Sequence, residues 1–420
     1  MKIQMVDLKG QYNKIKPQID EAVGAVMESC AFINGPQVKE FATHLQEYLG
    51  VKHVITCANG TDALQIALMA LDLKKGDEVI LPAFTYVATA EVIGLLGLTP
   101  VMVDVDPRSF NVTLQNIKKG LTPRTKAIVP VHLFGQSCDM EPIMEFANKH
   151  GLYVVEDNAQ ALGCDYIMGN QNNSNGADGV EHLPRALKCG TIGHIGCTSF
   201  FPSKNLGCYG DGGAMMTNDD ALAEKLRMIA NHGQRIKYHH SVIGCNSRLD
   251  TIQAAILDVK LSHLDEYCKA RRKAAHYYTE KLGEFDPEGR FFITPYEVAA
   301  DSECASEQKG YMPHVYHQYT LIINNECNNL LPDRKKLSTR DALKEYLAAN
   351  GIPSMVYYPL PLQEQEAFKA ISVAAEGLEV AKSLSGRVLS LPMHTELTEE
   401  IQDYIIEKIK SFFLADNKDV

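Results

Sequence analysis

Short β-branched runs alternate with stretches of helical period from about residue 50 onward, and this alternation constrains the fold more than any other feature. Strands are expected at Val54–Cys57, Glu78–Leu81, Pro100–Asp104, Ala127–His132, Leu152–Glu156 and Ala214–Thr217, with helices such as Thr61–Leu71 and Met140–Lys149 between them. Strands that are separated by helices are typical of a parallel sheet with helices packed on its faces. The sequence therefore predicts an α/β domain with a mostly parallel sheet.

The second part of the chain has a different pattern. A helical run at Thr251–Lys281 leads to shorter strands and helices, and the chain closes with an amphipathic helix around Glu399–Phe413. For 420 residues, two domains are expected. We predict a large domain over 1–265 and a smaller C-terminal α+β domain over 266–420. The polar stretch 169–179 has the composition of a surface loop and predicts an insertion at about 165–190.

Charge and hydropathy argue against several classes of protein. The net charge is −11 and no block of Lys or Arg occurs, which argues against an extended nucleic-acid-binding surface. The longest apolar run, Val92–Val105, is interrupted by Gly, Thr, Pro and Asp, and the N-terminus lacks the apolar core of a signal peptide. We expect a cytoplasmic protein that neither spans a membrane nor is exported.

The cysteines and histidines do not have the spacing of metal ligands. The eleven cysteines include no CxxC pair and no zinc-finger arrangement, and the histidines lack a carboxylate partner at ligand spacing. We expect reduced, mostly buried thiols and no metal site.

Two strand ends carry polar groups suited to a ligand. Asn59–Asp62 stands between a predicted strand and a predicted helix, where free backbone N–H groups favour an anion such as a phosphate; a simple capped helix start fits this string equally well. Asp157 follows the predicted strand Leu152–Glu156, at the end where open α/β sheets place their ligands. Its neighbour Glu156 could instead pair with a basic side chain, and spacing does not decide between the two.

Lys204 has no acidic residue near it in sequence, since Asp and Glu are absent from 183–210. An amine among aromatic and small residues can have a lowered pKa, which suits it to act as a Schiff-base nucleophile or proton carrier. A surface lysine whose stem covers apolar residues is the alternative interpretation. Ser199 precedes Lys204 by five residues and could offer its hydroxyl to the same anion, or it could be a satisfied strand-end serine.

Taken together, these residues resemble the DegT/StrS-type sugar nucleotide aminotransferases, which bind pyridoxal 5′-phosphate (PLP) on the aspartate aminotransferase-like fold. The resemblance runs nearly end to end, through Val6–Leu8, Ala58–Leu64, Pro82–Thr89, Glu156–Gln160, Ser199–Lys204, Gly210–Gly213, Asn246–Asp250 and Leu391–His394. Several ordered motifs at consistent spacing are more specific than any one of them. The resemblance implies a PLP-dependent transferase of fold type I; the polar insertion at about 165–190 is the main departure from the family.

The resemblance also implies roles for individual residues. Lys204 would form the Schiff base with the cofactor and later move the proton between the sugar carbon and the cofactor. Asp157 would keep the pyridine nitrogen protonated, so that the ring can act as an electron sink. The remaining cofactor contacts would be the phosphate-binding Gly60, Thr61, Asp62 and Ser199, the ring-stacking Tyr86 and the ring-hydroxyl partner Gln160. Asn246 would reach the cofactor phosphate of a second chain, so the resemblance implies a homodimer with shared active sites.

Within the family, the strings Cys197–Lys204, Tyr238–His240 and Gly244–Thr251 are most similar to enzymes that aminate UDP-2-acetamido-2-deoxy-3-oxo-D-glucuronate for bacterial surface polysaccharide (O-antigen). A uronate carries a carboxylate, and Arg248 supplies the planar donor pair that binds one. Arg248 also occurs in relatives that act on neutral sugars, so a neutral 3-oxo or 4-oxo nucleotide sugar is the alternative substrate. His317 and Tyr319, on a predicted strand at Val315–Ile323, are further candidates for sugar contacts. L-Glutamate is the expected amino donor.

Two other functions remain to be weighed. A PLP-dependent sugar dehydratase on the same scaffold would have histidine in place of Lys204, so the lysine argues against it. A non-catalytic regulator that only senses a ligand would not need Asp157, Gln160 and Lys204 together. The sequence therefore predicts an aminotransferase.

Overall fold

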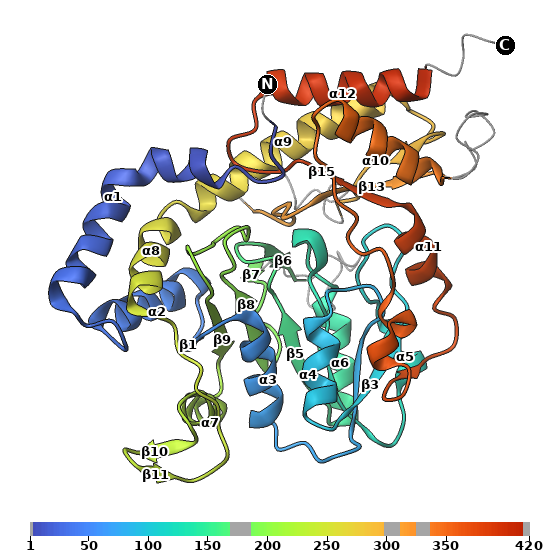
Figure 1. Cartoon of the computed structure of the whole chain (residues 1–420). Helices are drawn as coiled ribbons and strands as arrows, with labels where there is room; N and C mark the ends of the chain where they lie inside the picture. The colour runs from blue at the N-terminus through green and yellow to red at the C-terminus, as the bar shows by residue number, and fades with distance from the viewer. Residues whose placement is uncertain (1–2, 169–185, 298–310, 325–336, 415–420) are drawn as a thin grey trace, which may run out of the picture.

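An eight-stranded sheet occupies the centre of the molecule in this computed structural model, which describes residues 3–168, 186–297, 311–324 and 337–414 (Figure 1). In spatial order its strands are β1 (His53–Cys57), β9 (Gly213–Thr217), β8 (Ile195–Ser199), β5 (Tyr153–Asp157), β4 (Thr125–Ile128), β2 (Glu78–Pro82), β3 (Thr99–Val103) and β14 (Val373–Ala374). Strand β9 pairs antiparallel with both of its neighbours, and the other pairings in this sheet are parallel. The predicted mostly parallel α/β sheet is confirmed.

Helices connect the strands and cover the sheet. They are α3 (Gly60–Ala70), α4 (Ala88–Leu95), α5 (Leu114–Gly120), α6 (Met140–His150) and α7 (Asp220–Ala230). Every residue of β2 is buried, as expected for a parallel strand with helices on both faces. Local signals set the helix ends: Asn59 caps α3 by accepting the Asp62 N–H, and α6 stops at Gly151, whose φ of 62° favours glycine.

The C-terminal part builds a second, smaller core in the upper part of Figure 1. A three-stranded antiparallel sheet is formed there by β12 (Phe292–Ile293), β13 (Tyr319–Ile323) and β15 (Val388–Leu391). The helices of this region are α9 (Leu264–Phe285), α10 (Thr339–Ala349) and α12 (Glu399–Leu414). Their apolar faces pack around residues such as Tyr278, Leu389 and Ile405. The chain thus contains an α+β region distinct from the large sheet, and the boundary at residue 265 stays a prediction.

Part of the C-terminal sequence returns to the large sheet, a pairing that no sequence pattern predicted. Strand β14 pairs with β3 at the sheet edge, after the 3₁₀ turns Leu362–Glu364 and Glu366–Phe368. Helix α11 (Glu379–Arg387) follows, and its first N–H groups donate to the buried carboxylate of Asp104. Residues near 358 are thereby held against the large domain.

Three predicted elements differ from the structure by more than one residue at an end. The helix expected at Thr251–Lys281 is two helices, α8 (Thr251–Leu261) and α9, which are separated by a turn at Ser262 and His263, where His263 has φ −103° and ψ 0°. The strand expected at Ala127–His132 ends at Ile128, since Pro130 has no N–H for the ladder. The strand expected at Val315–Ile323 begins at Tyr319.

The remaining elements lie around the large sheet. Helices α1 (Leu8–Ser29) and α2 (Pro36–Leu49) pack against α8 at the left of Figure 1, and the hairpin of β10 (Gln234–Ile236) and β11 (His239–His240) lies at the lower left. The predicted insertion is flanked by the antiparallel pair β6 (Asp165–Ile167) and β7 (Ala186–Lys188). The polar stretch itself falls within 169–185, outside the described residues.

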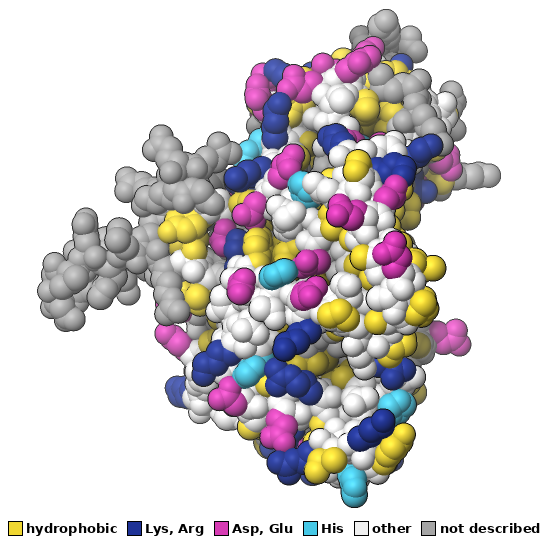
Figure 2. Space-filling model, turned by 90° about the vertical axis from the view of Figure 1, so that its left-hand side faces the viewer, with side chains coloured by type: hydrophobic (Ala, Val, Ile, Leu, Met, Phe, Trp, Pro, Cys, Tyr) yellow, Lys and Arg dark blue, Asp and Glu magenta, His cyan; other side chains and the backbone are white. Residues whose placement is uncertain are grey.

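The surface carries charges of both signs. Figure 2 shows Lys, Arg, Asp and Glu side chains interspersed over the face that includes α1, with no continuous field of one sign. No helix among the described residues is long and apolar enough to cross a membrane. Of the nine cysteines in the described ranges, seven are buried and none forms a disulfide, in agreement with the predicted mostly buried thiols.

Candidate active site

The site lies where three parallel strands end. Strands β1, β5 and β8 end at Cys57, Asp157 and Ser199, so residues 58–62, 157–160 and 199–204 follow them at one edge of the sheet. β5 and β8 are direct neighbours, with Asp157 opposite Cys197. The fold therefore brings together groups that are far apart in sequence, the most distant being Ala58 and Lys204, which are 146 residues apart.

The first turn of α3 is closely packed against the end of β8. A Cβ atom on Gly60 would lie 2.6 Å from the Ser199 Cβ, so no larger residue fits there. The N–H groups of Gly60 and Thr61 have no acceptor among the described residues, whereas the Asp62 N–H donates to Asn59. Free helical N–H groups beside a partly exposed serine are suited to an anion, which favours a phosphate cradle over a simple capped helix start.

The Asp62 side chain is bound by a segment that lies far from it in sequence. Its carboxylate accepts the Ser247 hydroxyl at 2.6 Å, and the Ser247 oxygen in turn accepts the Ala58 N–H at 3.0 Å. The side chain of Asp62 thus ties α3 to the segment that carries Asn246 and Arg248. Its predicted cofactor contact stays a prediction.

Asp157 is the buried carboxylate of the site. Burial raises its pKa, while hydrogen bonds from the Thr89 hydroxyl at 2.8 Å and the Ala159 N–H at 3.2 Å oppose the rise. A carboxylate held in this way is oriented by neutral donors and lacks a strong cationic partner. It is suited to pair with a protonated nitrogen of a ligand.

Glu156, the neighbour of Asp157, has a structural role. Its fully buried carboxylate accepts His132 Nε2 at 2.8 Å and the N–H groups of Gly190 and Ile192 at 2.8 and 2.7 Å. Burial by itself would raise the pKa of Glu156, but the hydrogen bonds from His132 and from the backbone outweigh it and the pKa is lowered. Of the two interpretations left open by the sequence, pairing with a basic side chain is the correct one.

Lys204 lies in a tight loop after β8. Its own N–H donates to the Phe201 carbonyl at 2.8 Å, and the Cys208 N–H donates to Phe200 to close the loop. Desolvation lowers the pKa of Lys204 to about 8, and the nearby charge of Asp157 acts in the opposite direction. A larger share of uncharged amine at neutral pH favours nucleophilic attack on an aldehyde.

Gln160 is fixed between two parts of the chain. Its Oε1 accepts the Phe134 N–H at 2.7 Å, and its Nε2 donates to the Tyr358 hydroxyl at 3.1 Å. The ring of Tyr358 lies 6.2 Å from that of Tyr86, which is 56% exposed. Tyr86, Gln160 and Tyr358 thus form one side of the site.

These groups match the cofactor that the resemblance implies. PLP combines an aldehyde, an anionic phosphate, a basic ring nitrogen and a ring oxygen. The structure offers an amine of lowered pKa, a cradle of free N–H groups that a Cβ at Gly60 would fill, a buried carboxylate and an amide donor. The residues present therefore fit PLP, with Lys204, Gly60, Thr61, Ser199, Asp157 and Gln160 as those that would hold it.

Asn246 and Arg248 extend from the segment beside α3. Asn246 is exposed, Arg248 is partly exposed, and the side chain of neither makes a hydrogen bond or ion pair with the described residues. Both are therefore free to contact a ligand or a second chain. Their predicted roles stay predictions.

His317 and Tyr319 differ in their surroundings. Desolvation lowers the pKa of His317 well below its usual value, Lys204 and Arg271 add to the effect, and its buried Nδ1 has no partner in the described structure. The imidazole is therefore neutral and close enough to Lys204 to interact with its charge. Tyr319 is fully buried in the C-terminal core and shares a hydrogen bond of 2.9 Å with Thr279. Its position does not support the predicted sugar contact.

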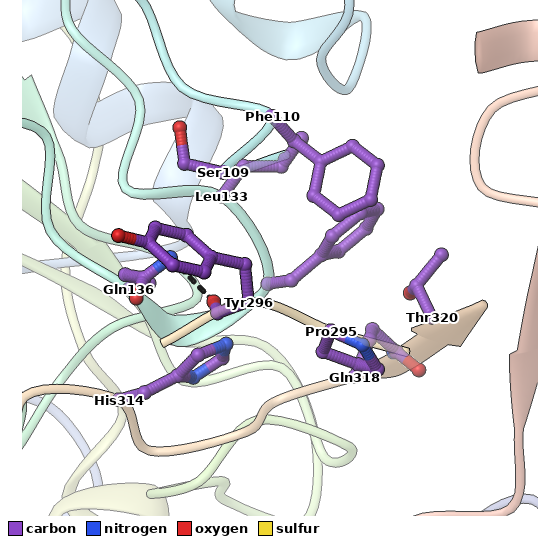
Figure 3. Close-up of a pocket in the computed structure, with 10 residues that line it drawn as sticks. Ser109, Phe110, Leu133, Gln136, Pro295, Tyr296, His314, Gln318 and Thr320 are labelled. Carbon is purple, nitrogen blue, oxygen red and sulfur yellow. Dashed lines mark hydrogen bonds between the residues drawn. The ribbon is translucent and has the colours of Figure 1, made fainter. Parts of the chain in front are cut away.

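A small pocket lined in part by Phe134 lies next to the site, since the Phe134 N–H donates to Gln160. Figure 3 shows the Phe110 ring on one side of it and Tyr296, His314 and Gln318 on the other, with Gln136 Nε2 donating to the Tyr296 carbonyl at 3.1 Å. It is formed where segments 295–296 and 314–320 meet loops of the large sheet. Neither Lys204 nor Asp157 lines this pocket, so it is not the reaction centre.

Two site residues were not identified from the sequence. Thr89 is part of the quoted motif Pro82–Thr89, but its hydrogen bond to Asp157 had no local signal. Tyr358 is 198 residues from Gln160 and carries no motif that would have indicated the contact.

Comparison with known proteins covers nearly the whole chain. The profile of the DegT/DnrJ/EryC1/StrS aminotransferase family matches residues 13–410. The chain is 44% identical over 414 residues to a "Pleiotropic regulatory protein" of Geobacillus stearothermophilus, covering 98% of this chain and 99% of that protein. It is 43% identical to a UDP-N-acetyl-3-dehydro-alpha-D-glucosamine 3-aminotransferase of Acidithiobacillus ferrooxidans, covering 95% and 94%. It is 42% identical to a UDP-2-acetamido-2-deoxy-3-oxo-D-glucuronate aminotransferase of Pseudomonas aeruginosa, covering 94% and 96%.

Solved structures show the same similarity. A DegT DnrJ EryC1 StrS aminotransferase from Brucella abortus superimposes with a TM-score of 0.82 at 40% identity, covering 98% of this chain and 99% of that one. NtdA from Bacillus subtilis, with bound cofactor PMP, gives a TM-score of 0.78 at 28% identity, covering 96% and 82%. The similarity thus extends over both the large sheet and the C-terminal region.

Proposed function

Because the chain belongs to the DegT/DnrJ/EryC1/StrS aminotransferase family, we propose that it aminates the 3-oxo group of UDP-2-acetamido-2-deoxy-3-oxo-D-glucuronate, with L-glutamate as amino donor. It is a PLP-dependent sugar nucleotide aminotransferase, which confirms the prediction of fold, cofactor and enzyme class. The observation that carries the aminotransferase chemistry is Lys204, an amine of lowered pKa near the buried carboxylate of Asp157, whereas the choice of the uronate rests on Arg248.

Each residue of the site contributes a defined part of the reaction. When bound, PLP supplies the electron sink and carries the amino group between the two substrates. Asp157 holds the proton on the ring nitrogen, which its orientation by Thr89 and Ala159 favours. The Lys204 amine carries a proton to and from the substrate carbon, since its pKa of about 8 allows both protonation states near neutral pH.

Arg248 supports the uronate as substrate. Its guanidinium is partly exposed and unpaired among the residues described, so it is free to bind a carboxylate in the bidentate manner that arginine favours. A neutral UDP-linked 3-oxo sugar is the second candidate, because the relative named for one is equally similar to this chain. His317 is proposed to contact either sugar through its open imidazole.

The regulatory alternative has one observation in its favour, the name of the Geobacillus relative. Against it, a protein that only senses a ligand has no need for an amine of lowered pKa next to a buried carboxylate. We therefore propose that the protein is a catalyst. We further propose that it acts in the cytosol and contributes to the synthesis of surface polysaccharide. Asn246 is proposed to reach the cofactor phosphate of a second chain in a homodimer.

The visible spectrum of the purified protein with PLP tests the proposal. We expect a yellow band that bleaches with L-glutamate and returns with the 3-oxo-glucuronate but not with a neutral 3-oxo or 4-oxo nucleotide sugar. Lys204→Ala should abolish the response to glutamate. Lys225→Ala is the matched control, since Lys225 pairs with Asp72 away from the site.

The outcomes separate the parts of the proposal. Recovery of the band with only a neutral sugar would overturn the role of Arg248 and leave the chemistry in place. Absence of the band at every PLP concentration would contradict the proposal that the protein is a PLP-dependent enzyme.

A further inference from the structure

Tyr358 has a hydroxyl proton without an acceptor. Its oxygen accepts the Gln160 Nε2–H at 3.1 Å, and no group in the described ranges accepts the Tyr358 proton in turn. A phenol next to a ligand site that lacks an acceptor is suited to donate to the ligand. None of the motifs in the sequence assigns a role to this residue.

The orientation of Gln160 is not ambiguous here. The Phe134 N–H is a donor, so the amide oxygen of Gln160 must face it, and the NH₂ group must face Tyr358. Gln160 then has one N–H left for a ligand. The two residues together offer two donors and no acceptor.

The surroundings place this donor pair at the cofactor. The Tyr358 ring lies 6.2 Å from Tyr86 and 6.0 Å from Phe84, and its hydroxyl is close enough to Asp157 to interact with the charge of that carboxylate. Tyr86, Tyr357 and Asp157 are the titratable groups that act on it. Desolvation raises the pKa of Tyr358, so the hydroxyl keeps its proton at neutral pH.

We propose that Tyr358 is a further cofactor-binding residue, whose hydroxyl donates a hydrogen bond to the anionic ring oxygen of PLP beside Gln160. This inference rests on the PLP chemistry proposed above. Two neutral donors stabilise the negative charge on that oxygen, so the residue from the C-terminal part of the chain adjusts the acidity of the bound cofactor.

Tyr358→Phe tests the inference without removing the ring. We expect PLP affinity to fall about ten-fold, and the pH midpoint of the absorbance change of bound PLP to rise by about one unit, because the deprotonated form loses a donor. The control is Tyr357→Phe. Tyr357 is the neighbouring tyrosine, is partly buried, and its hydroxyl makes no hydrogen bond with the described residues. It should leave both values unchanged.

A cofactor analogue that lacks the ring oxygen, 3-deoxypyridoxal 5′-phosphate, gives a test that does not depend on the variant's stability. Wild type should bind the analogue more weakly than PLP. For Tyr358→Phe, the loss of affinity between PLP and the analogue should be much smaller. Equal losses in both proteins, or a raised KM for the sugar with unchanged cofactor affinity and spectrum, would overturn the inference. Failure of wild type to bind PLP at all would instead overturn the proposed function.

Discussion

Burial acts in opposite directions on the two central residues of the site. It raises the pKa of the Asp157 carboxyl and lowers the pKa of the Lys204 amine to about 8, because a low-polarity environment disfavours either charge. Both shifts suit the reaction, since the cofactor nitrogen gives Asp157 a cation to pair with and Lys204 must lose its proton to react. The same shifts destabilise the chain without cofactor.

Asp157→Asn separates these two effects. The variant keeps the shape of the side chain and loses its charge, so we expect kcat to fall by about 100-fold or more while PLP still binds. Spectroscopic titration with PLP and steady-state kinetics measure the two quantities. A variant with wild-type kcat would show that Asp157 does not hold the proton on the ring nitrogen.

The pH dependence of stability gives an independent check. The pKa of Asp157 is raised in the folded chain, so its contribution to stability is present at low pH and is lost as the pH rises above its usual value of 3.8 and through the folded value. Without cofactor, the Tm of Asp157→Asn should therefore be higher than that of wild type at pH 7.5, and the difference in Tm should be smaller at pH 4. Thermal unfolding followed by circular dichroism at the two pH values measures this difference.

At the scale of elements, the site depends on how closely α3 approaches β8. The first turn of α3 can offer its N–H groups beside Ser199 because position 60 has no side chain. The Ser247 hydroxyl, bound to Asp62, holds the same turn from the other side. The phosphate cradle is thus a property of packing between three segments.

Gly60→Ala tests this packing. The added Cβ would meet Ser199 at 2.6 Å and push α3 away from β8, so we expect PLP affinity to fall at least ten-fold with the overall fold kept. Gly24→Ala is the control, because a Cβ there meets nothing within 4 Å and alanine favours the helix α1. Fluorescence titration with PLP and circular dichroism decide the outcome; equal affinity in both variants would argue against the cradle.

Over the whole molecule, a single chain leaves several large apolar side chains exposed to solvent. Ile236, Tyr238 and Ile243, in and after the β10–β11 hairpin, are 67%, 78% and 87% exposed, and Asn246 follows on the same segment. Exposed apolar side chains gathered on one segment are typical of an interaction surface. They are consistent with the proposed homodimer, in which this segment would meet a second copy.

Mixing two defective variants tests whether active sites are shared. If Asn246 acts on the partner's cofactor, Lys204→Ala and Asn246→Asp chains that are co-expressed will form mixed dimers with one intact site. Random pairing then restores about a quarter of wild-type activity, whereas each variant by itself stays inactive. No recovery in purified mixed dimers would place Asn246 in the site of its own chain.

The fold class, the family and the central chemical groups all follow from the amino-acid sequence. Hydrophobic periodicity predicted most strands of the sheet, although not β8 and β14. Asp157 was predicted from its place at the carboxyl end of a strand, and Lys204 from the absence of acidic residues near it in sequence and from the family resemblance. These properties are local or repeat along the chain, so they can be read without coordinates. The break between α8 and α9 was missed because Ser262 and His263, which form the turn, are neither Gly nor Pro, the residues that most often mark a helix end in sequence.

Which polar groups contact one another became clear from the three-dimensional packing. In the folded chain, Glu156 binds His132 and Asp62 binds Ser247, while Tyr319 is buried in the C-terminal core. Thr89 and Tyr358 lie at the site, through hydrogen bonds to Asp157 and Gln160. The physical reason is that the partners of a buried polar group are set by packing between segments far apart in sequence, and periodicity carries no information about such pairs. The sequence predicted which residues could react, and the packing decided which of them are held in place to do so.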